Sequence, residues 1–331
     1  MVGVVLPLAL SGCAGSIRGF GIAESPWYAY DNGGNAAYLQ RLNLMQQLGA
    51  SSLRVDFPPT VIGTPEYNNI YDEATSRGIK IIALANSPYP SDTAAYVRNL
   101  LTHYPAVAAI EMGNEQNLGS AGTDGFVGNP AAYAATLGAA FDAKEQLNRS
   151  IPLLIGGMAA WGPGDPAQTH GSLLDPYWYL NGILGSGAAA KYRSAHGRFP
   201  WDGIGIHPYA DWSDNVKNGQ PIASGYGVLQ CHLLARSKGD PGIMWDTEFG
   251  YSTTSNSASA DPAVAAQWLS DFGTWWKNQP WTGAFMYYDM DTSPSSTGRE
   301  AGFGLIDRSN GKPAGAAKRA TFAAFSRLAH A

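Results

Sequence analysis

The sequence predicts a single-domain (β/α)8 barrel, the TIM-barrel class of α/β fold. Apolar runs of strand length alternate eight times with amphipathic segments of helix length. Neither a linker nor a change of composition interrupts this alternation over the 331 residues. Because 45% of the residues are apolar and only 14% are charged, the chain can bury one large core, which excludes a disordered chain and a coiled coil.

The eight expected strands are short apolar runs that end in polar residues, glycine or proline. They cover residues 18–23, 52–57, 79–84, 108–112, 152–156, 203–207, 243–247 and 283–287. The expected helices cover 35–48, 66–77, 92–104, 129 to about 148, a segment that begins at 175, and about 313 to 328. Gly49 and Gly78 end the first two helices, whereas Asn129 and Pro130 supply an N-cap and a first-turn proline for the fourth.

A doubly wound sheet is the competing α/β fold. Its dinucleotide fingerprint needs three glycines in the first turn, and Gly19-Phe20-Gly21 lacks the third. The sequence also has no P-loop, no Gly-x-Ser-x-Gly elbow and no His-Glu-x-x-His motif among its six histidines. We therefore expect carboxylates to carry the chemistry, with no metal ion and no organic cofactor.

Residues 1–16 are typical of a secretory or lipoprotein-type segment, which leaves 17–331 as the catalytic domain. The apolar run 2–10 is too short to span a bilayer, and Leu10-Ser11-Gly12-Cys13 resembles a lipobox, whose cysteine is lipid-modified after cleavage. No Lys or Arg precedes the run, and a buried first strand is the alternative. With a lipid on Cys13, Cys231 stays unpaired. The expected location is extracytoplasmic, either secreted or anchored to the cell envelope.

The net charge of −5 is not concentrated in runs, so we expect no nucleic-acid partner and no membrane-surface helix. No pattern indicates an oligomer, and a monomer is expected. Ten Trp and seventeen Tyr supply many flat rings that can stack on sugar faces, although most of them are expected in the core.

Two acidic side chains stand at the ends of expected strands. Glu115 follows the run 108–112, and Glu248 ends the run that begins at 243. Because the carboxyl ends of parallel strands meet at one face of a barrel, both carboxylates can face one cleft. Hydrolysis of an acetal needs such a pair, one group to protonate the leaving oxygen and one to attack or to activate water. The alternative is that each Glu caps the following helix or forms an ion pair.

This arrangement, with Asn114 directly before Glu115, resembles the retaining glycoside hydrolases of clan A, which include families 5 and 39. The resemblance covers the chain from the first strand to the last helix. It implies that Glu115 is the general acid/base and Glu248 the nucleophile, so Glu115 must begin protonated and Glu248 ionised. It also implies retention of configuration, with the two carboxyl groups about 5 to 5.5 Å apart.

The same resemblance implies substrate-binding roles for further residues. Asn114 matches the amide that bonds the 2-hydroxyl group of the sugar, and Arg54 matches the arginine that keeps Glu248 ionised. Arg54 has an alternative, because a strand arginine can instead pair with Asp56 or Glu111.

Aromatic and imidazole groups follow the later strands. His207 and Tyr209, after the sixth strand, match the position that contacts the nucleophile, although a buried core histidine is the alternative for His207. Many clan members end the eighth strand in a tryptophan under the sugar; this chain lacks it there, and Tyr287 is the expected replacement. Further candidate sugar platforms in the loops after the fifth and sixth strands are Trp161, Trp178 and Trp212.

The expected function is a retaining β-glycosidase that hydrolyses a polysaccharide or oligosaccharide by double displacement. Long loops after the fourth, fifth and sixth strands favour an open cleft and endo action. Two alternatives stay open: a catalytically inactive glycan-binding lipoprotein on the same barrel, and a transglycosylase that uses the same residues. The sugar and the linkage depend on loop geometry that a single sequence does not reveal.

Overall fold

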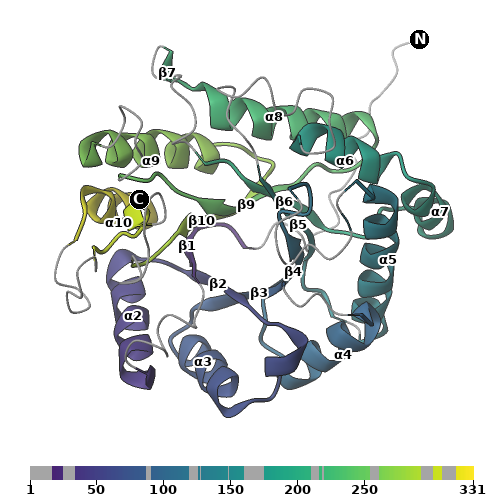
Figure 1. Ribbon diagram of the computed structural model, residues 1–331, viewed down its shortest axis with the longest axis horizontal. Coiled ribbons are helices and arrows are strands. Elements are labelled where there is room, and N and C mark those ends of the chain that lie inside the picture. Colours follow the sequence, from purple (N-terminus) through teal and green to yellow (C-terminus); the bar gives the residue numbers. More distant parts are fainter. Residues whose placement is uncertain are drawn as a thin grey trace, which may run out of the picture.

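Eight parallel strands close into a barrel, and a ring of helices surrounds it (Figure 1). The strand order is β1-β10-β9-β6-β5-β4-β3-β2, and β1 closes the barrel by pairing with both β2 and β10. The predicted single-domain (β/α)8 fold is confirmed. The computed structural model describes residues 17–24, 34–86, 91–118, 126, 128–147, 149–159, 175–209, 216–217, 220–253, 261–291, 301–307 and 318–331.

The elements follow the expected alternation. The barrel strands are β1 (Phe20–Ala23), β2 (Ser52–Asp56), β3 (Lys80–Ala85), β4 (Ala109–Asn114), β5 (Leu153–Ala159), β6 (Gly203–His207), β9 (Met244–Phe249) and β10 (Thr282–Tyr288). The helices are α2 (Gly34–Leu48), α3 (Pro65–Ser76), α4 (Thr93–His103), α5 (Pro130–Gln146), α6 (Pro176–Leu184), α7 (Gly187–His196), α8 (Ile222–Ser237), α9 (Pro262–Lys277) and α10 (Ala320–His330). A 3-10 turn (Pro59–Val61) follows β2, and β7 (Val216–Lys217) and β8 (Gln220–Pro221) form a hairpin before α8.

Short polar side chains begin several of these helices. In each case a side-chain oxygen accepts a hydrogen bond from a backbone N–H of the first turn, which satisfies a donor that the helix itself leaves unpaired. The caps of this kind include Asp92 for α4, Asn129 for α5, Asp175 for α6 and Asp261 for α9.

Some helices differ from the sequence expectation. The sequence patterns give no bounds for α7, α8 and α9, and the first two turns of α8 contain Gly225 and Gly227, which are poor helix formers. The last helix begins at Ala320 rather than near 313. Lys318 forms an antiparallel bridge with Ile306, so the chain is still extended two residues before α10.

An apolar layer fills the barrel interior near the amino-terminal ends of the strands. The indole of Trp245 lies in this layer and is completely buried. A Cβ added at Gly203 or at Gly283 would come within 2.6 Å of this ring, so glycine on the two strands beside β9 makes room for it. A larger apolar core lies between the strands and the helices. The polar site therefore stands on a rigid, packed base.

Two bulges alter the side-chain alternation near the carboxyl ends of the strands. Along their shared edge, β9 advances three residues, from Asp246 to Phe249, while β10 advances two. The extra residue lets Thr247 and Glu248, which are adjacent in sequence, both join one polar network. A similar extra residue in β5 lies beside Gly157.

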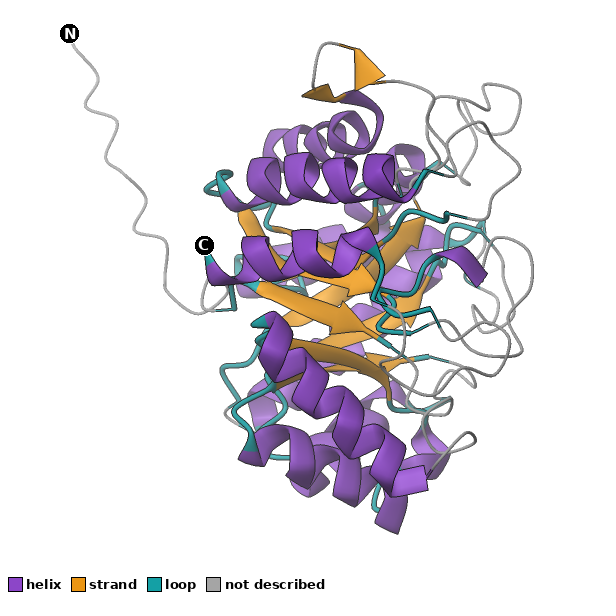
Figure 2. Cartoon of the chain, turned by 90° about the vertical axis from the view of Figure 1, so that its left-hand side faces the viewer, coloured by secondary structure: helices purple, strands orange, loops and turns teal. Residues whose placement is uncertain are grey.

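The barrel strands all point the same way, so their carboxyl ends gather at one face of the molecule (Figure 2). That face carries the ends of β4, β6 and β9, where the candidate polar residues lie. Within the described segments, no helix is both long and apolar enough to cross a membrane.

Candidate active site

The two candidate catalytic carboxylates lie at the ends of β4 and β9. Glu115 directly follows β4 with a left-handed backbone, φ 51°, and its N–H donates to the carbonyl of Gly157 at 2.8 Å. An oxygen of Glu115, an oxygen of Glu248 and a ring nitrogen of His207 all lie within 4.8 Å of one another. The side chains of Glu115 and Glu248 are 22% and 13% exposed, so neither is completely buried.

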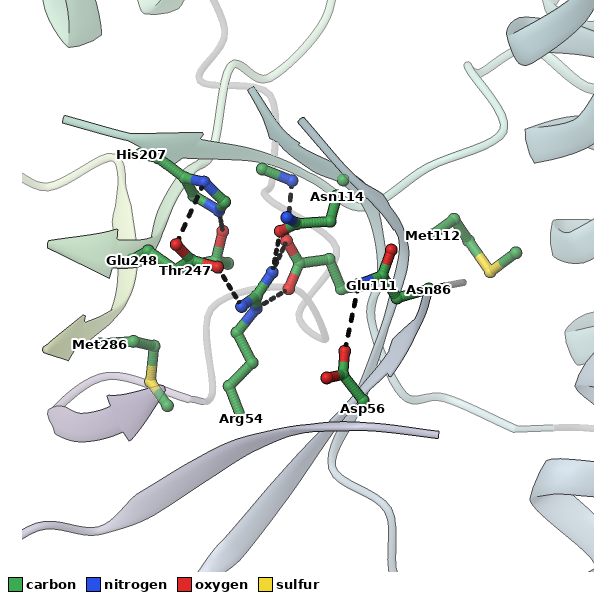
Figure 3. A network of polar contacts seen from close by, with 12 residues as sticks. Arg54, Asp56, Asn86, Glu111, Met112, Asn114, His207, Thr247, Glu248 and Met286 are labelled. Atoms are coloured by element: carbon green, nitrogen blue, oxygen red, sulfur yellow. Dashed lines mark hydrogen bonds and ion pairs between the residues drawn. The ribbon is translucent and has the colours of Figure 1, made fainter. Parts of the chain in front are cut away.

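Arg54 on β2 joins β4 to the candidate nucleophile (Figure 3). Its guanidinium donates to Glu248 Oε1 at 2.7 Å, to Asn114 Oδ1 at 2.7 Å, and to both oxygens of Glu111. Glu111 is fully buried and also accepts the N–H of Gly157 at 2.7 Å. The contact expected from the resemblance and the alternative pairing with Glu111 therefore occur together, through different N–H groups of one arginine.

Asp56, the other alternative partner of Arg54, accepts a hydrogen bond from Asn86 Nδ2 at 3.4 Å. Arg54 acts on Asp56 through its charge, which only partly offsets the effect of burial on the pKa of that carboxyl. The arginine therefore pairs with Glu111 and Glu248 and not directly with Asp56.

The surroundings of Glu248 favour its ionised form. Burial alone would raise the pKa of Glu248, but His207, Arg54 and a hydrogen bond from Tyr209 outweigh it, and the pKa lies below its ordinary value. Tyr209 Oη donates to Glu248 Oε2 at 2.6 Å, and burial, followed by the charge of Glu248, raises the pKa of this phenol. Arg54 keeps its proton because Glu111 and Glu248 outweigh the lowering of its pKa by burial. Glu248 is thus held as a carboxylate, the form that a nucleophile needs.

His207 lies between the two carboxylates at the end of β6 and is fully buried. Its Nδ1 is 3.1 Å from Glu115 Oε1 and 3.6 Å from Glu248 Oε2, and its Nε2 is 3.1 Å from Thr247 Oγ1. A Cβ on Gly157 would overlap the Nε2 edge of this ring, so only glycine fits there. The ring is buried as a core histidine would be, and it also contacts both candidate catalytic groups.

Asp246 is a buried carboxyl two residues before Glu248. Its register partners are Ile206 on β6 and Phe285 on β10, both of which belong to the apolar core between strands and helices. Neither carboxyl oxygen has a hydrogen-bond partner that meets normal geometry. Burial, with the charge of Glu248 next, raises the pKa of Asp246 well above its usual range, and this favours the protonated form.

The structure does not bring Tyr287 to this site. Its ring is fully buried, packs against Phe249 and Phe325 on the helix side of β10, and donates its hydroxyl to the carbonyl of Phe303. The neighbouring Tyr288 is the residue of β10 that contacts the ring of Tyr209. The expectation that Tyr287 replaces the missing tryptophan is therefore wrong, because strand alternation directs it away from the barrel interior.

The remaining predicted sugar platforms are not placed at the site. Trp178 lies on α6 with 41% of its surface exposed and contacts Tyr177. Trp161, Trp212, the N-terminal segment 1–16 and Cys13 lie outside the described residues. Cys231 is buried and forms no disulfide within the part of the chain that the structure describes.

One group of donors in the described part of the chain has the spacing of a metal site: Glu115, His207 and Glu248. Arg54, which is protonated and 2.7 Å from Glu248, already neutralises the charge of that carboxylate. A cation placed there would meet that positive charge at close range. The donor set suits proton transfer and nucleophilic attack better than metal binding.

Three residues of the network have no functional role in the sequence analysis: Glu111, Thr247 and Gly157. Glu111 entered only as an alternative partner of Arg54, although a carboxylate inside an apolar strand is itself a signal of a buried ionic contact. The Gly156-Gly157 pair in the fifth apolar run is a comparable signal of close backbone approach. No sequence pattern marks Thr247, because a threonine is common in any strand.

Comparisons with solved structures show similar folds among glycoside hydrolases. A family 39 glycoside hydrolase from Bacteroides cellulosilyticus WH2 matches with a TM-score of 0.63 at 18% identity, over 95% of this chain and 64% of that one. A β-glucuronidase from Faecalibacterium prausnitzii matches with a TM-score of 0.61 at 14% identity, over 95% of this chain and 49% of that one. A GH128 endo-β-1,3-glucanase from Amycolatopsis mediterranei, in complex with laminaripentaose, matches with a TM-score of 0.52 at 16% identity, over 94% and 99%.

The chain thus spans less than two thirds of the length of the first two of these proteins. No family model and no curated protein matches the sequence. At these identities the similarity concerns the fold, and at that level the resemblance to clan A glycoside hydrolases is confirmed.

Proposed function

We propose that this chain is a retaining β-glycosidase in which Glu248 is the nucleophile and Glu115 the general acid/base. The observation that supports this best is the proximity of the two carboxylates, which have oxygens within 4.8 Å of each other at the open face of the barrel. Inverting enzymes separate their carboxyl groups by about 6.5 to 9.5 Å to leave room for water, so the shorter spacing favours retention. The glycoside hydrolases that share the fold add support.

In the first step, a carboxylate oxygen of Glu248 attacks the anomeric carbon and the bond to the leaving oxygen breaks. Glu115 gives its proton to that oxygen, so the aglycone leaves as a neutral alcohol. Arg54 and Tyr209 hold the two oxygens of Glu248 with hydrogen bonds of 2.7 and 2.6 Å, which fixes the carboxylate before attack.

In the second step, water attacks the anomeric carbon of the glycosyl ester and the bond to Glu248 breaks. Glu115, now a carboxylate, takes the proton from water. The product keeps its anomeric configuration, and both groups return to their starting forms. Arg54 holds Asn114 through Oδ1, so in this scheme the Nδ2 group of Asn114 is the donor to the 2-hydroxyl of the sugar.

We further propose endo action on a polysaccharide or oligosaccharide. The enzyme from Amycolatopsis mediterranei, which shares the fold over nearly its full length, is an endo-β-1,3-glucanase in complex with laminaripentaose. The alternative is a catalytically inactive glycan-binding protein on the same barrel, and the experiment below separates the two.

The test is intact-mass spectrometry after incubation with a panel of 2-deoxy-2-fluoro β-glycosides bearing good leaving groups, followed by peptide mapping. The fluorine slows breakdown of the glycosyl ester, so a sugar adduct on Glu248 is expected with the glycoside that fits. Glu248→Gln should abolish the adduct, whereas Glu145→Gln, whose side chain on α5 is 58% exposed, should retain it. An adduct on another residue would refute the assignment of the nucleophile.

A further inference from the structure

The hydroxyl of Thr247 has one hydrogen-bond partner among the described residues, the ring of His207 at 3.1 Å. Thr247 is fully buried directly before Glu248 on β9. A threonine hydroxyl can donate one hydrogen bond and accept others. The direction of this contact therefore decides whether Nε2 of His207 carries a proton.

A proton on Nε2 would leave two contacts unsatisfied. His207 would donate to Thr247 Oγ1, and the hydroxyl proton of Thr247 would be left without an acceptor in a fully buried position, which is costly. The bare Nδ1 would also point its lone pair at an oxygen of ionised Glu248, 3.6 Å away, and it could bond Glu115 Oε1, 3.1 Å away, only by holding the proton that Glu115 must give to the leaving oxygen.

With the proton on Nδ1, every contact is satisfied. Thr247 donates to Nε2, and Nδ1–H donates to Glu115 Oε1 at 3.1 Å and attracts Glu248 Oε2, 3.6 Å away, through its partial charge. We propose that Thr247 is a positioning residue that holds His207 in the Nδ1–H form, so that one N–H serves both catalytic carboxylates; this rests on the glycosidase function proposed above.

The fold supplies the space that this arrangement needs. A Cβ on Gly157 would overlap His207 Nε2 and lie 2.5 Å from Thr247 Oγ1. Thr247 stands two residues after the interior Trp245, so strand alternation directs it to the interior, and the bulge in β9 brings Glu248 to the same side. This placement and the glycine at position 157 leave room for a direct contact between hydroxyl and ring.

The groups that face His207 show what the N–H does during the reaction. Glu115 lies at the end of β4 and Glu248 on β9, and the ring of Tyr209 meets the imidazole edge-on after β6. Arg54 on β2 faces Glu248 from the other side. Glu248 is ionised before attack and Glu115 afterwards, so negative charge moves between two oxygens that Nδ1–H reaches without a change of rotamer.

The direct test is NMR of the protein with ¹⁵N-labelled histidine rings at neutral pH, with the His207 signals assigned by loss in His207→Gln. The expected spectrum shows a protonated Nδ1 and a bare Nε2. A neutral ring with its proton on Nε2, or a ring protonated on both nitrogens, would overturn the proposal. This readout needs no substrate, so it stands or fails separately from the adduct experiment.

Variants give the second test. Thr247→Val should remove the preference for Nδ1–H in the NMR spectrum and lower kcat/KM on an aryl glycoside about tenfold, the value of about one hydrogen bond. Thr247→Ser, which keeps the hydroxyl, should restore both. Thr282→Val is the matched control, since Thr282 is buried on β10 and donates to the carbonyl of Trp276 away from the site. An unchanged His207 spectrum in Thr247→Val would refute the role of the hydroxyl.

Discussion

Replacement of Glu111 by glutamine tests whether the Arg54 network is held together by charge. The substitution keeps the shape of the side chain but removes its negative charge and turns one acceptor into a donor. The new amide does not fit the same partners, because its NH2 group must face the guanidinium of Arg54 in either orientation and in one of them also the N–H of Gly157, and all of these groups are donors.

The expected loss is large because the ion pair between Glu111 and Arg54 is buried. Glu111 is fully buried and accepts two hydrogen bonds from Arg54 and one from Gly157. Removal of one partner from a buried ion pair leaves the other charge uncompensated and costs about 3 to 5 kcal/mol. Glu248 and Asp56 still act on the charge of Arg54, so the lower part of this range is expected.

Urea unfolding at neutral pH measures the free energy of unfolding, and an unchanged m-value would show that the comparison is valid. Glu73→Gln is the control, because Glu73 pairs with Arg77 on the surface of α3 and should cost at most about 0.5 kcal/mol. kcat/KM should also fall more than tenfold in Glu111→Gln, since Arg54 loses its support. A loss no larger than that of Glu73→Gln would refute the reasoning.

Three further predictions concern neighbouring residues. Tyr209→Phe removes a hydrogen bond to the ionised carboxylate of Glu248 and so raises the pKa of Glu248. Because activity is lost as pH falls through that pKa, the acid limb of the pH profile of kcat/KM should move to higher pH. An acid limb that does not move would contradict the contact. The raised pKa of Asp246 means that the folded chain keeps a proton that the unfolded chain releases, so the free energy of unfolding should fall as pH rises from about pH 4. In Asp246→Asn, urea unfolding should show no such fall from this residue. Gly157→Ala should displace His207 and cost about 1 to 3 kcal/mol in thermal unfolding together with most activity; wild-type behaviour would show that the ring can move aside.

The barrel could be predicted from the sequence because its strands are continuous apolar runs and its helices begin at capping residues such as Asp92 and Asn129. The carboxylates Glu115 and Glu248 could be found because they follow such runs. Arg54, His207 and Tyr209 came from the resemblance to known enzymes, and the structure brings all three to Glu248.

The remaining features depend on backbone geometry that residue types do not encode locally. Tyr287 and Tyr288 are equal candidates in the sequence, and only the register of β10 shows that the second one faces the site. Glu248 joins Thr247 on the interior side because β9 contains a bulge, and no residue in that strand signals a bulge. The bounds of α8 could not be predicted, because its first turns contain glycines that are typical of a loop.

The left-handed backbone at Glu115 has a consequence for attempts to improve this protein. A side chain with a Cβ costs about 1 kcal/mol or more in that conformation, whereas glycine adopts it freely and asparagine more readily than glutamate. Directed evolution that scores heat resistance alone will therefore enrich Gly or Asn at position 115. Selection of this kind would yield more heat-resistant proteins in which residue 115 can no longer donate a proton. Libraries screened for thermal stability should therefore keep Glu115 unchanged.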